Sequence, residues 1–395
     1  MKQPRLVKPA ATPTRRLAGD NSAAGKCLQH DNTQVRGFAK LLLPWYETAK
    51  RDLPWRRSEG DPYAIWISEI MLQQTTVAAV IPFFNRWMIS FPTVQALAAA
   101  DIEDVLKHWA GLGYYARARN LHRAAQKIVA EYGGVLPASA EELRTLPGIG
   151  RYTSGAIASI AYNQNEPLVD ANVARVLSRV FGLLEDMKTS AAAAEKVWSI
   201  AEAVIPDGHA GDFNQAMMEL GALVCSAAAP RCDRCPLQPI CVAAASGDPT
   251  AYPESPGAKR WLDIDDSAVA LTDDRGRLLI TQRPLTAALW GGLWELPRVT
   301  RQQDETIPDA AHRALETHGV TAENLYPFGV VKHVVANRRV QLHGFRAHLG
   351  REITSEQEGT RWILPAQASE FAMATPQVRL LALWNAGREQ ATLEI

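Results

Sequence analysis

Apolar residues recur with a helical period through the first part of the chain. Between Phe38 and Ile240, Ala, Leu and Ile return at intervals of three, four and seven positions, which is the spacing of amphipathic helices. Short breaks rich in Gly and Pro interrupt this pattern at residues 60–62, 111–113, 133–134 and 206–208. The pattern therefore predicts an all-α region over residues 36–245.

The pattern changes after Cys241. Residues 246–263 contain several prolines and no periodic apolar positions, which predicts an extended linker. Beyond it, short alternating or β-branched segments that are typical of strands occur at residues 267–272, 277–281 and 339–345. Because a helical stretch also occurs near residues 310–318, we expect residues 264–395 to form an α+β domain.

The composition narrows the choice of function. The chain has 395 residues, enough for two or three domains with buried cores. Its 42 Lys and Arg balance 42 Asp and Glu, so binding of a nucleic acid must use local basic patches rather than net charge. No apolar run approaches the roughly 20 residues that cross a bilayer, which predicts a soluble globular protein with no membrane partner.

Residues 1–35 are basic, poor in acids and without periodic apolar positions. This composition predicts a disordered arm. It also fits a transit peptide, although its Pro and Ala content favours no amphipathic helix. We keep organellar targeting by the arm as the alternative to a location in the cytoplasm of a bacterium.

Four of the five cysteines lie in one short segment. They follow the spacing C-x6-C-x2-C-x5-C and are Cys225, Cys232, Cys235 and Cys241. Four soft ligands so close together indicate a metal centre in a reducing compartment. Structural zinc sites usually combine two CxxC or Cys and His pairs, whereas this segment has one CxxC and no nearby His, so an iron–sulfur cubane is favoured and zinc is the alternative. The fifth, Cys27, lies in the arm and is expected to be free.

A tight turn between two helices is predicted near the middle of the all-α region. Ser139 and Glu142 form a capping-box pattern for a helix that we expect to end at Leu146. The sequence Leu-Pro-Gly-Ile-Gly at residues 146–150 then leads into a second helix, from Arg151. The sequence therefore predicts a helix–hairpin–helix unit.

The backbone N–H groups of this turn, at Gly148 and Gly150, are able to bind an anion together with the N-terminus of the second helix. The basic residues expected near the turn are Arg117, Arg119, Arg123, Arg144 and Arg151. This combination favours a sequence-independent grip on the DNA backbone. The alternative is an ordinary corner between two helices.

Glu69 is the one acid in an apolar helical segment. Its helical neighbours are Ile65, Trp66 and Leu72, so its carboxyl group shares an apolar face. Loss of water there would raise its pKa and keep a proton on it near neutral pH, as a general acid requires. The alternative is a glutamate at a helix end that reaches out to solvent.

Asp170 has the opposite kind of environment. It directly precedes the periodic helix at residues 173–180, which predicts a helix N-cap. A purely structural cap is one interpretation. However, cap hydrogen bonds and the positive end of a helix would also keep this carboxylate ionised. One protonated and one charged carboxyl group is the division of roles that breaks glycosidic bonds.

These motifs together resemble the endonuclease III superfamily of DNA glycosylases, and within it the adenine DNA glycosylase (MutY) family. The resemblance runs from about Phe38 through the linker into the C-terminal domain. Its further motifs are Leu53-Pro-Trp, Pro62-Tyr-x-x-Trp-x-Ser-Glu-x-Met-Leu-Gln-Gln-Thr, Gly111-Leu-Gly-Tyr-Tyr and Phe213-Asn-Gln-Ala-Met-Met-Glu-Leu-Gly.

The resemblance implies a multidomain fold, in which an all-α helix–hairpin–helix glycosylase with an iron–sulfur cluster loop precedes an α+β Nudix-like domain. The six-helix subdomain would take residues 63–165, and the cluster subdomain would take residues 36–62 and 166–245. The implied enzyme is a monomer with one 4Fe-4S cluster. It would remove adenine opposite 8-oxoguanine or guanine in double-stranded DNA.

The resemblance also implies roles for individual residues. Glu69 is similar to the acid that protonates adenine, Asp170 to the carboxylate that stabilises the sugar cation, and Tyr152 and Asn172 to their supports. The wall of the adenine pocket would comprise Arg51, Leu53, Trp55, Val77, Gln215 and Met218. Contacts to DNA would comprise Gln74, Thr75, Leu112, the wedge Tyr114, Gly148, Gly150, Lys332 and His333. For Leu53, Val77 and Met218, ordinary core packing is the alternative.

Several departures bear on function. Tyr152 stands where the endonuclease III-like lyases for oxidised pyrimidines carry a Schiff-base lysine, so efficient strand nicking is not expected. Two alternative functions compete with removal of adenine. One is that of such a pyrimidine glycosylase and lyase, and the other is that of a non-catalytic iron–sulfur protein that scans DNA. The C-terminal helix near Arg313 lacks the paired Glu ligands of a Nudix hydrolase. Val331-Lys332-His333 replaces the family's Phe-Ser-His or Phe-Thr-His, and Ala171 replaces a usual glycine.

Overall fold

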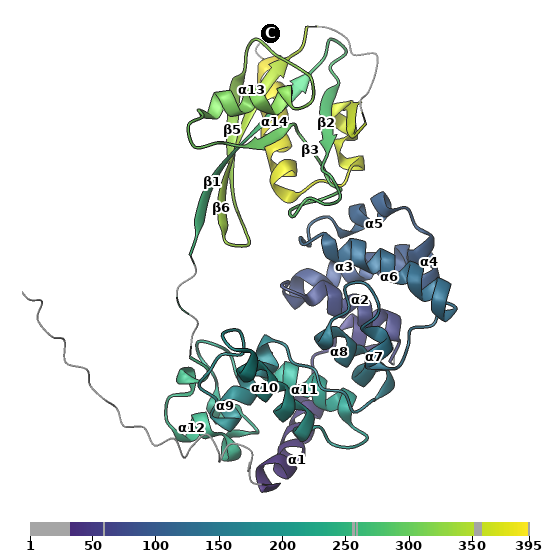
Figure 1. Ribbon diagram of the computed structural model, residues 1–395, viewed down its shortest axis with the longest axis vertical. Helices are drawn as coiled ribbons and strands as arrows, with labels where there is room; N and C mark the ends of the chain where they lie inside the picture. Colours follow the sequence, from purple (N-terminus) through teal and green to yellow (C-terminus); the bar gives the residue numbers. More distant parts are fainter. Residues whose placement is uncertain (1–31, 58–59, 255–256, 258–259, 351–357, 394–395) are drawn as a thin grey trace, which may run out of the picture.

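The computed structural model describes residues 32–57, 60–254, 257, 260–350 and 358–393 (Figure 1). Cys27 and most of the predicted arm lie outside these residues. The first helix, α1, begins at Asn32 and therefore inside the segment that was predicted to be the arm. No helix among the described residues is long and apolar enough to span a membrane.

The first part of the chain is helical, as the apolar period predicts. Its helices are α1 (Asn32–Ala49), η1 (Pro54–Arg56), α2 (Pro62–Leu72), α3 (Val77–Ser90), α4 (Val94–Ala99), α5 (Ile102–Trp109), α6 (Ala116–Tyr132), α7 (Ala140–Leu143), α8 (Arg151–Tyr162), α9 (Ala171–Phe181), α10 (Ala191–Val204), α11 (Ala210–Leu223), η2 (Cys232–Arg234), η3 (Gln238–Ile240), α12 (Val242–Ala245) and η4 (Pro249–Ala251). The last of these is a short 3-10 turn inside the segment predicted to be an extended linker.

These helices form two separate apolar cores. Helices α2 to α8 pack around Trp66, Trp87 and Trp109, which are almost completely buried. Helix α1 instead packs with α9 to α11, around residues that include Phe38 and Phe213. Each fully buried large apolar side chain contributes roughly 1.5–3 kcal/mol, so both subdomains have substantial cores. The cavity described below lies where the two meet.

The helix–hairpin–helix unit connects α7 to α8. The hydroxyl of Ser139 accepts hydrogen bonds from the backbone N–H of Glu141 and Glu142 at the start of α7, which forms half of the predicted capping box. Helix α7 ends at Leu143, not at Leu146 as predicted, because the chain turns toward the hairpin earlier. Gly148 has a φ of +79°, a conformation that favours glycine.

The C-terminal domain is a mixed sheet between helices. Its elements are β1 (Leu262–Thr272), β2 (Leu278–Gln282), β3 (Trp294–Glu295), β4 (Arg298–Thr300), α13 (Ile307–Glu316), β5 (Tyr326–Val335), β6 (Arg338–His348), β7 (Thr360–Ile363), η5 (Pro365–Glu370) and α14 (Thr375–Leu393). The strand order is β3-β2-β1-β6-β5, in which β1 and β6 are parallel, while β4 pairs with β1 and β7 with β2. The predicted α+β class is confirmed.

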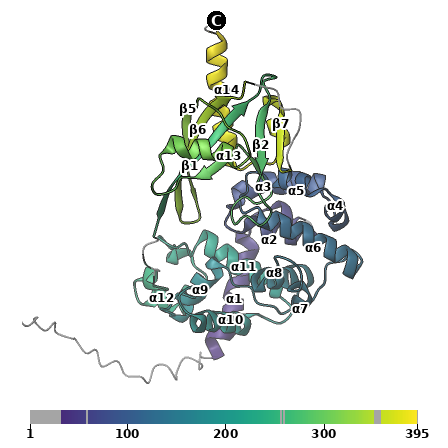
Figure 2. The same ribbon diagram turned by 45° about the horizontal axis from the view of Figure 1, so that its top comes forward.

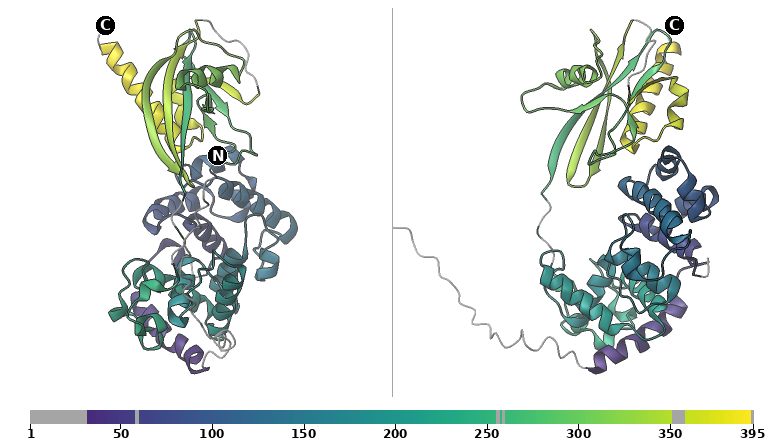
Figure 3. Two further views of the ribbon diagram at one scale, coloured as in Figure 1. Left: turned by 60° about the vertical axis from the view of Figure 1, so that its left-hand side comes forward. Right: turned by 45° about the vertical axis from the view of Figure 1, so that its right-hand side comes forward.

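The side chains of β1 alternate between two layers. Ala268 and Ala270 pack in the core that includes residues of α14, whereas Val269 and Leu271 pack in the core that includes residues of α13. This is the two-residue period of a strand that is covered on both faces. Figure 3 shows the two helices on opposite sides of the sheet.

The linker connects the C-terminal domain to the helical region, and the C-terminal domain also contacts the six-helix subdomain directly (Figure 2). The Tyr115 hydroxyl donates to the backbone oxygen of Met373 at 3.3 Å, and Arg119 donates to the backbone oxygen of Gly291 at 2.5 Å. Leu293 of the C-terminal domain joins the core of helices α2 to α8. The two parts are therefore joined at two places.

Candidate active site

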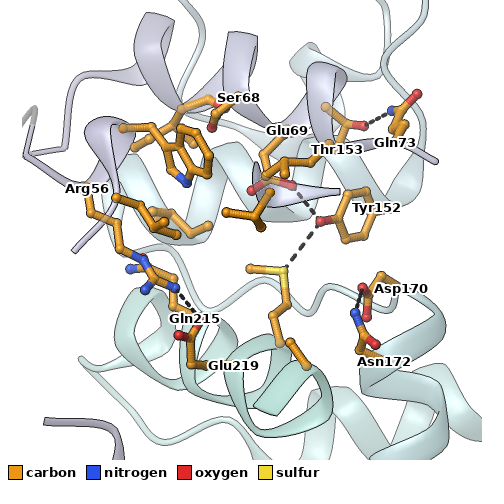
Figure 4. A pocket seen from close by; sticks show the side chains of 18 of the residues that line it. Arg56, Ser68, Glu69, Gln73, Tyr152, Thr153, Asp170, Asn172, Gln215 and Glu219 are labelled. Carbon is orange, nitrogen blue, oxygen red and sulfur yellow. Dashed lines mark hydrogen bonds and ion pairs between the residues drawn. The ribbon is translucent and has the colours of Figure 1, made fainter. Parts of the chain in front are cut away.

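A cavity of about 1150 Å³ lies between the two helical subdomains. Its lining includes fourteen of the residues singled out in the sequence, namely Arg51, Leu53, Trp55, Glu69, Gln74, Thr75, Val77, Gly148, Gly150, Tyr152, Asp170, Asn172, Gln215 and Met218. Figure 4 shows that Glu69 and Asp170 reach this space from different elements, with Tyr152 beside Glu69. The four predicted catalytic residues and the six predicted pocket residues thus share one cavity.

Glu69 lies in α2, and its side chain is directed into the protein. Asp61 caps this helix by accepting a hydrogen bond from the N–H of Tyr63, and Pro62 occupies the first turn. Glu69 is 5% exposed, and burial raises its pKa to about 7, with a further increase from the charge of Asp170. The carboxyl group is therefore able to hold a proton near neutral pH, as predicted.

Tyr152, in the first turn of α8, donates its hydroxyl to Oε2 of Glu69 at 2.5 Å. Burial, followed by the charges of Glu69 and Asp170, raises the pKa of Tyr152 well above its ordinary value. The phenol therefore stays neutral and acts as a donor. Its hydrogen bond lowers the pKa of Glu69 and so limits the effect of burial.

Asp170 is the N-cap of α9, as predicted. Its Oδ1 accepts from the N–H of Val173 at 2.7 Å, and its Oδ2 accepts from the Asn172 amide at 2.9 Å. One expectation needs correction, because burial raises the pKa of Asp170 and these hydrogen bonds only oppose that change. The capping bonds still favour the charged form of the carboxylate.

Two glycines allow the backbone around Asp170 to pack closely. A methyl group on Gly221 of α11 would lie 2.6 Å from the Cβ of Asn172. A methyl group on Gly155 of α8 would overlap the backbone oxygen of Pro167, in the segment that leads to Asp170. The placement of this carboxylate therefore depends on residues that have no side chain.

A buried ion network forms the opposite side of the cavity, and the residue at its centre was not among the predicted site residues. Glu219 of α11 is 1% exposed and accepts from Arg51 at 2.6 and 3.0 Å and from Arg56 at 3.0 Å. Arg56 also donates to Gln215 at 3.1 Å. Burial would raise the pKa of Glu219, but the two guanidinium groups outweigh it, so its pKa is lowered.

This arrangement fits cleavage of a glycosidic bond. Glu69 supplies a proton in a site where its charged form is disfavoured, and Asp170 supplies a hydrogen-bonded carboxylate in the same cavity. An acid that protonates a leaving group and a carboxylate that stabilises a sugar cation are the two groups this reaction needs.

The other expected DNA contacts in the six-helix subdomain lie in two loops. Gln74 and Tyr114 both have positive φ angles, of 59° and 49°. Tyr114 is 49% exposed, as a residue that inserts into DNA must be. Leu112 is 6% exposed and packs in the core, so its predicted contact to the lesion stays a prediction.

The basic residues near the hairpin are less available than expected. Arg117 is occupied by five backbone oxygens, and Arg119 by Gly291 of the C-terminal domain. Both terminal nitrogens of Arg117 are therefore occupied, which corrects the prediction for this residue. Arg119 uses one terminal nitrogen for its bond to Gly291 and is partly exposed, so its contact to a phosphate stays a prediction. Arg123, Arg144 and Arg151 are exposed, as are Gly148 and Gly150.

Lys332 and His333 lie on strand β5 rather than in a loop. Successive side chains of a strand point to opposite faces, so Lys332 and His333 point to different faces of the sheet, although both line one cavity at its edge. Lys332 is exposed, whereas the ring of His333 lies 5.6 Å from that of Trp290. Neither ring nitrogen of His333 has a hydrogen-bond partner in the part of the chain that the structure describes.

The four cysteines of the C-x6-C-x2-C-x5-C segment line a single small cavity with apolar residues. In the described ranges, no three His, Cys, Asp or Glu side chains are arranged to hold a metal ion, so the predicted cluster stays a prediction. The buried Arg179 donates to Sγ of Cys225 at 3.3 Å. Four sulfur donors beside a buried positive charge are a chemical fit for an iron–sulfur cluster.

Comparisons with known proteins identify the family of this chain. Residues 67–202 match the model of the HhH-GPD superfamily of base excision DNA repair proteins, and residues 267–383 match a NUDIX domain. Human adenine DNA glycosylase is 36% identical over 92% of this chain and 77% of its own length, and the rat enzyme is 34% identical over 91% and 80%. A thermostable thymine-DNA glycosylase is 28% identical with a TM-score of 0.49, over 54% of this chain and 98% of that chain.

The fold and the site therefore define a base-excision DNA glycosylase of the helix–hairpin–helix class with a Nudix-like C-terminal domain. The chain belongs to the adenine DNA glycosylase family. It is an enzyme that removes adenine from DNA, which confirms this part of the function that the resemblance implied. This result favours the adenine enzyme over the pyrimidine enzyme and the non-catalytic protein.

Proposed function

We propose that the substrate of this enzyme is adenine paired with 8-oxoguanine, or with guanine, in double-stranded DNA, and that a monomer carries out the reaction. The buried Glu69 with its tyrosine partner, in the same cavity as Asp170, is the observation that carries the catalytic part of this proposal. The C-terminal domain, attached to the six-helix subdomain through Tyr115 and Arg119, supports the part that concerns the opposite base.

The reaction follows from the environments of the two carboxyl groups. A base inside a duplex cannot reach Glu69, so the adenine must first be extruded into the cavity. Glu69 donates its proton to N7 of the base, and the electron pair of the C1′–N9 bond leaves with the adenine. Asp170 stabilises the positive charge on the sugar. Water then adds to C1′ and loses its proton to the Glu69 carboxylate.

We further propose that the enzyme does not nick the strand efficiently. A lyase of this fold forms a Schiff base through a lysine, and that position holds Tyr152, whose hydroxyl is engaged with Glu69.

The test is single-turnover cleavage of three duplexes, which carry adenine opposite 8-oxoguanine, adenine opposite guanine, or thymine glycol. We expect fast removal of adenine, fastest opposite 8-oxoguanine, with strand breaks only after alkali treatment. Equal rates for the two adenine duplexes would refute this preference for 8-oxoguanine over guanine as the opposite base. Cleavage of thymine glycol would refute the adenine mechanism.

We also propose that the four-cysteine segment holds one 4Fe-4S cluster, which would serve to order this loop, and that the protein works in the reducing cytoplasm of a bacterium, at the nucleoid. The all-sulfur donor set and the adjacent Arg179 support the cluster. Purified protein should be brown and contain about four iron and four sulfide per chain. Colourless protein that contains zinc would contradict this proposal.

A further inference from the structure

Arg117 connects two loops that belong to different steps of the proposed reaction. Its side chain rises from the first turn of α6 and is largely enclosed. One terminal nitrogen donates to the backbone oxygens of Ile70, Met71 and Gln73 at 2.5, 3.2 and 2.8 Å. These oxygens belong to the last turn and the C-cap of α2, the helix that carries Glu69.

The other terminal nitrogen of Arg117 reaches the second loop. It donates to the backbone oxygens of Leu112 and Gly113, both at 3.2 Å. The guanidinium also lies over the rings of Trp109 and Tyr114, at 5.1 and 5.6 Å from their centroids. The planar fork therefore spans from the end of α2 to the loop that carries the predicted wedge.

Backbone oxygens, rather than the carboxylate of an Asp or Glu, stabilise the positive charge of Arg117. Among the ion pairs of the described residues, none includes Arg117, and its Nε is buried without a partner. Burial lowers its pKa to about 10, so the group remains charged at neutral pH. The negative end of the α2 dipole and five backbone oxygens stabilise it. Lysine could not reproduce this contact, because an ammonium group has no rigid fork.

We infer that Arg117 is a positioning residue that fixes the Tyr114 loop relative to the end of the Glu69 helix, so that insertion of the wedge and presentation of the acid to the extruded base are coupled. This inference rests on the proposed role of Tyr114 as a wedge. Ile70 directly follows Glu69, so a shift of the helix end moves the acid. Gln73 directly precedes Gln74 and Thr75, which line the same cavity.

A double-mutant cycle tests this coupling. The variants Arg117→Lys, Tyr114→Ala and their combination are compared in single-turnover removal of adenine opposite guanine and opposite 8-oxoguanine. Because a misplacement of about 1 Å can reduce a rate about a hundredfold, we expect Arg117→Lys to lower the rate by roughly that factor. In the Tyr114→Ala background, the same change should cost less than about threefold, because the wedge to be coupled is gone. Multiplicative losses would overturn the inference.

A matched control separates this effect from general damage. Arg86, on the exposed side of α3, also lies over an aromatic ring, that of Phe83 at 4.6 Å. The ring of Phe83 approaches Gly111, but among the side-chain hydrogen bonds of the described residues none joins Arg86 to either loop. Arg86→Lys therefore removes a similar stacking contact without any hydrogen bond to the two loops, and it should leave the rate unchanged. A loss as large as that of Arg117→Lys would also count against the inference.

A measurement on the unaltered side chain covers the case in which Arg117→Lys does not fold. Hydrogen exchange is followed in the full-length protein, with and without a duplex that carries an uncleavable adenine analogue. Residues 70–75 and 111–114 should gain protection together, and both should lose that gain in Tyr114→Ala. Protection of residues 111–114 alone would refute the coupling. Equal wild-type rates for adenine opposite 8-oxoguanine and opposite guanine would refute the preference for 8-oxoguanine in the proposed function. The double-mutant cycle measured with adenine opposite guanine would still test the role of Arg117.

Discussion

The two sides of the active-site cavity each present a buried glutamate, and these two residues have opposite properties. Glu69 is 5% exposed and Glu219 is 1% exposed. Burial raises the pKa of Glu69 to about 7, and the hydrogen bond from Tyr152 opposes this increase only in part. Burial also acts on Glu219, but Arg51 and Arg56 lower its pKa below the ordinary value.

Burial raises the pKa of both carboxyl groups, and the two guanidinium groups that contact Glu219 reverse this effect there, whereas the contact of Glu69 with the neutral Tyr152 does not. One side of the cavity can deliver a proton, while the other stays charged and rigid. The same cavity can therefore protonate the base at one end and hold it in place at the other.

The largest effect is expected from Glu69→Gln. Loss of a general acid typically costs about 10²–10⁴-fold, so single-turnover removal of adenine should fall by that amount. Burial raises the folded-state pKa of Glu69 from its ordinary value of 4.5 to about 7, so ionisation of this group lowers the stability of the wild type as the pH increases through this range. Above pH 7 the neutral variant should therefore be as stable as the wild type or more so, in thermal melts. Unchanged activity would exclude Glu69 as the acid.

A smaller effect is expected from Glu219→Gln. The change leaves Arg51 and Arg56 without their shared carboxylate, and the partial exposure of Arg51 reduces the cost. We expect a loss of about 2 kcal/mol in the free energy of unfolding by denaturant titration, as for a charged hydrogen bond. The pH at which the rate is half-maximal should stay where it is in the wild type. A shift as large as one pH unit would mean that the two sides are not independent.

The smallest effect is expected from Tyr152→Phe. The lost hydrogen bond had lowered the pKa of Glu69, so that pKa should rise in the variant. Because Glu69 must be protonated to act, the wild-type rate should fall as pH increases above about 7, and the variant should fall at higher pH. The pH profile of the single-turnover rate measures this shift. A shift to lower pH would contradict the assignment of the tyrosine as a donor to the carboxylate.

Much of the fold and of the catalytic cavity could be predicted from the sequence. The helical period and the change of pattern after Cys241 gave the order of the two domain types, and local context was enough for Glu69 and Asp170. In both cases the signal is local in the sequence. For Glu69 it is the set of apolar neighbours within one turn of the helix, and for Asp170 it is the position directly before a helix. The motifs of the resemblance then indicated the remaining catalytic residues and the wall of the pocket.

The rest depends on contacts between distant segments. Arg117 is a basic residue of the kind that contacts DNA. Only the folded structure shows that its terminal nitrogens already donate hydrogen bonds to backbone oxygens of two loops. Glu219 could have been suspected from its place in the Phe213 motif, but its partners lie 163 and 168 residues away. The opposite directions of the Lys332 and His333 side chains could be predicted only once these residues were known to lie within a strand.

The close packing at Gly155 and Gly221 has a consequence for genetic variation in this enzyme. Both sites lack room for even a methyl group, and both press on the segment that holds Asp170 and Asn172. Inherited or selected replacements at these two positions should therefore abolish repair while leaving every reactive group intact. A survey that scores harmful substitutions by their distance from the reacting groups alone would overlook them.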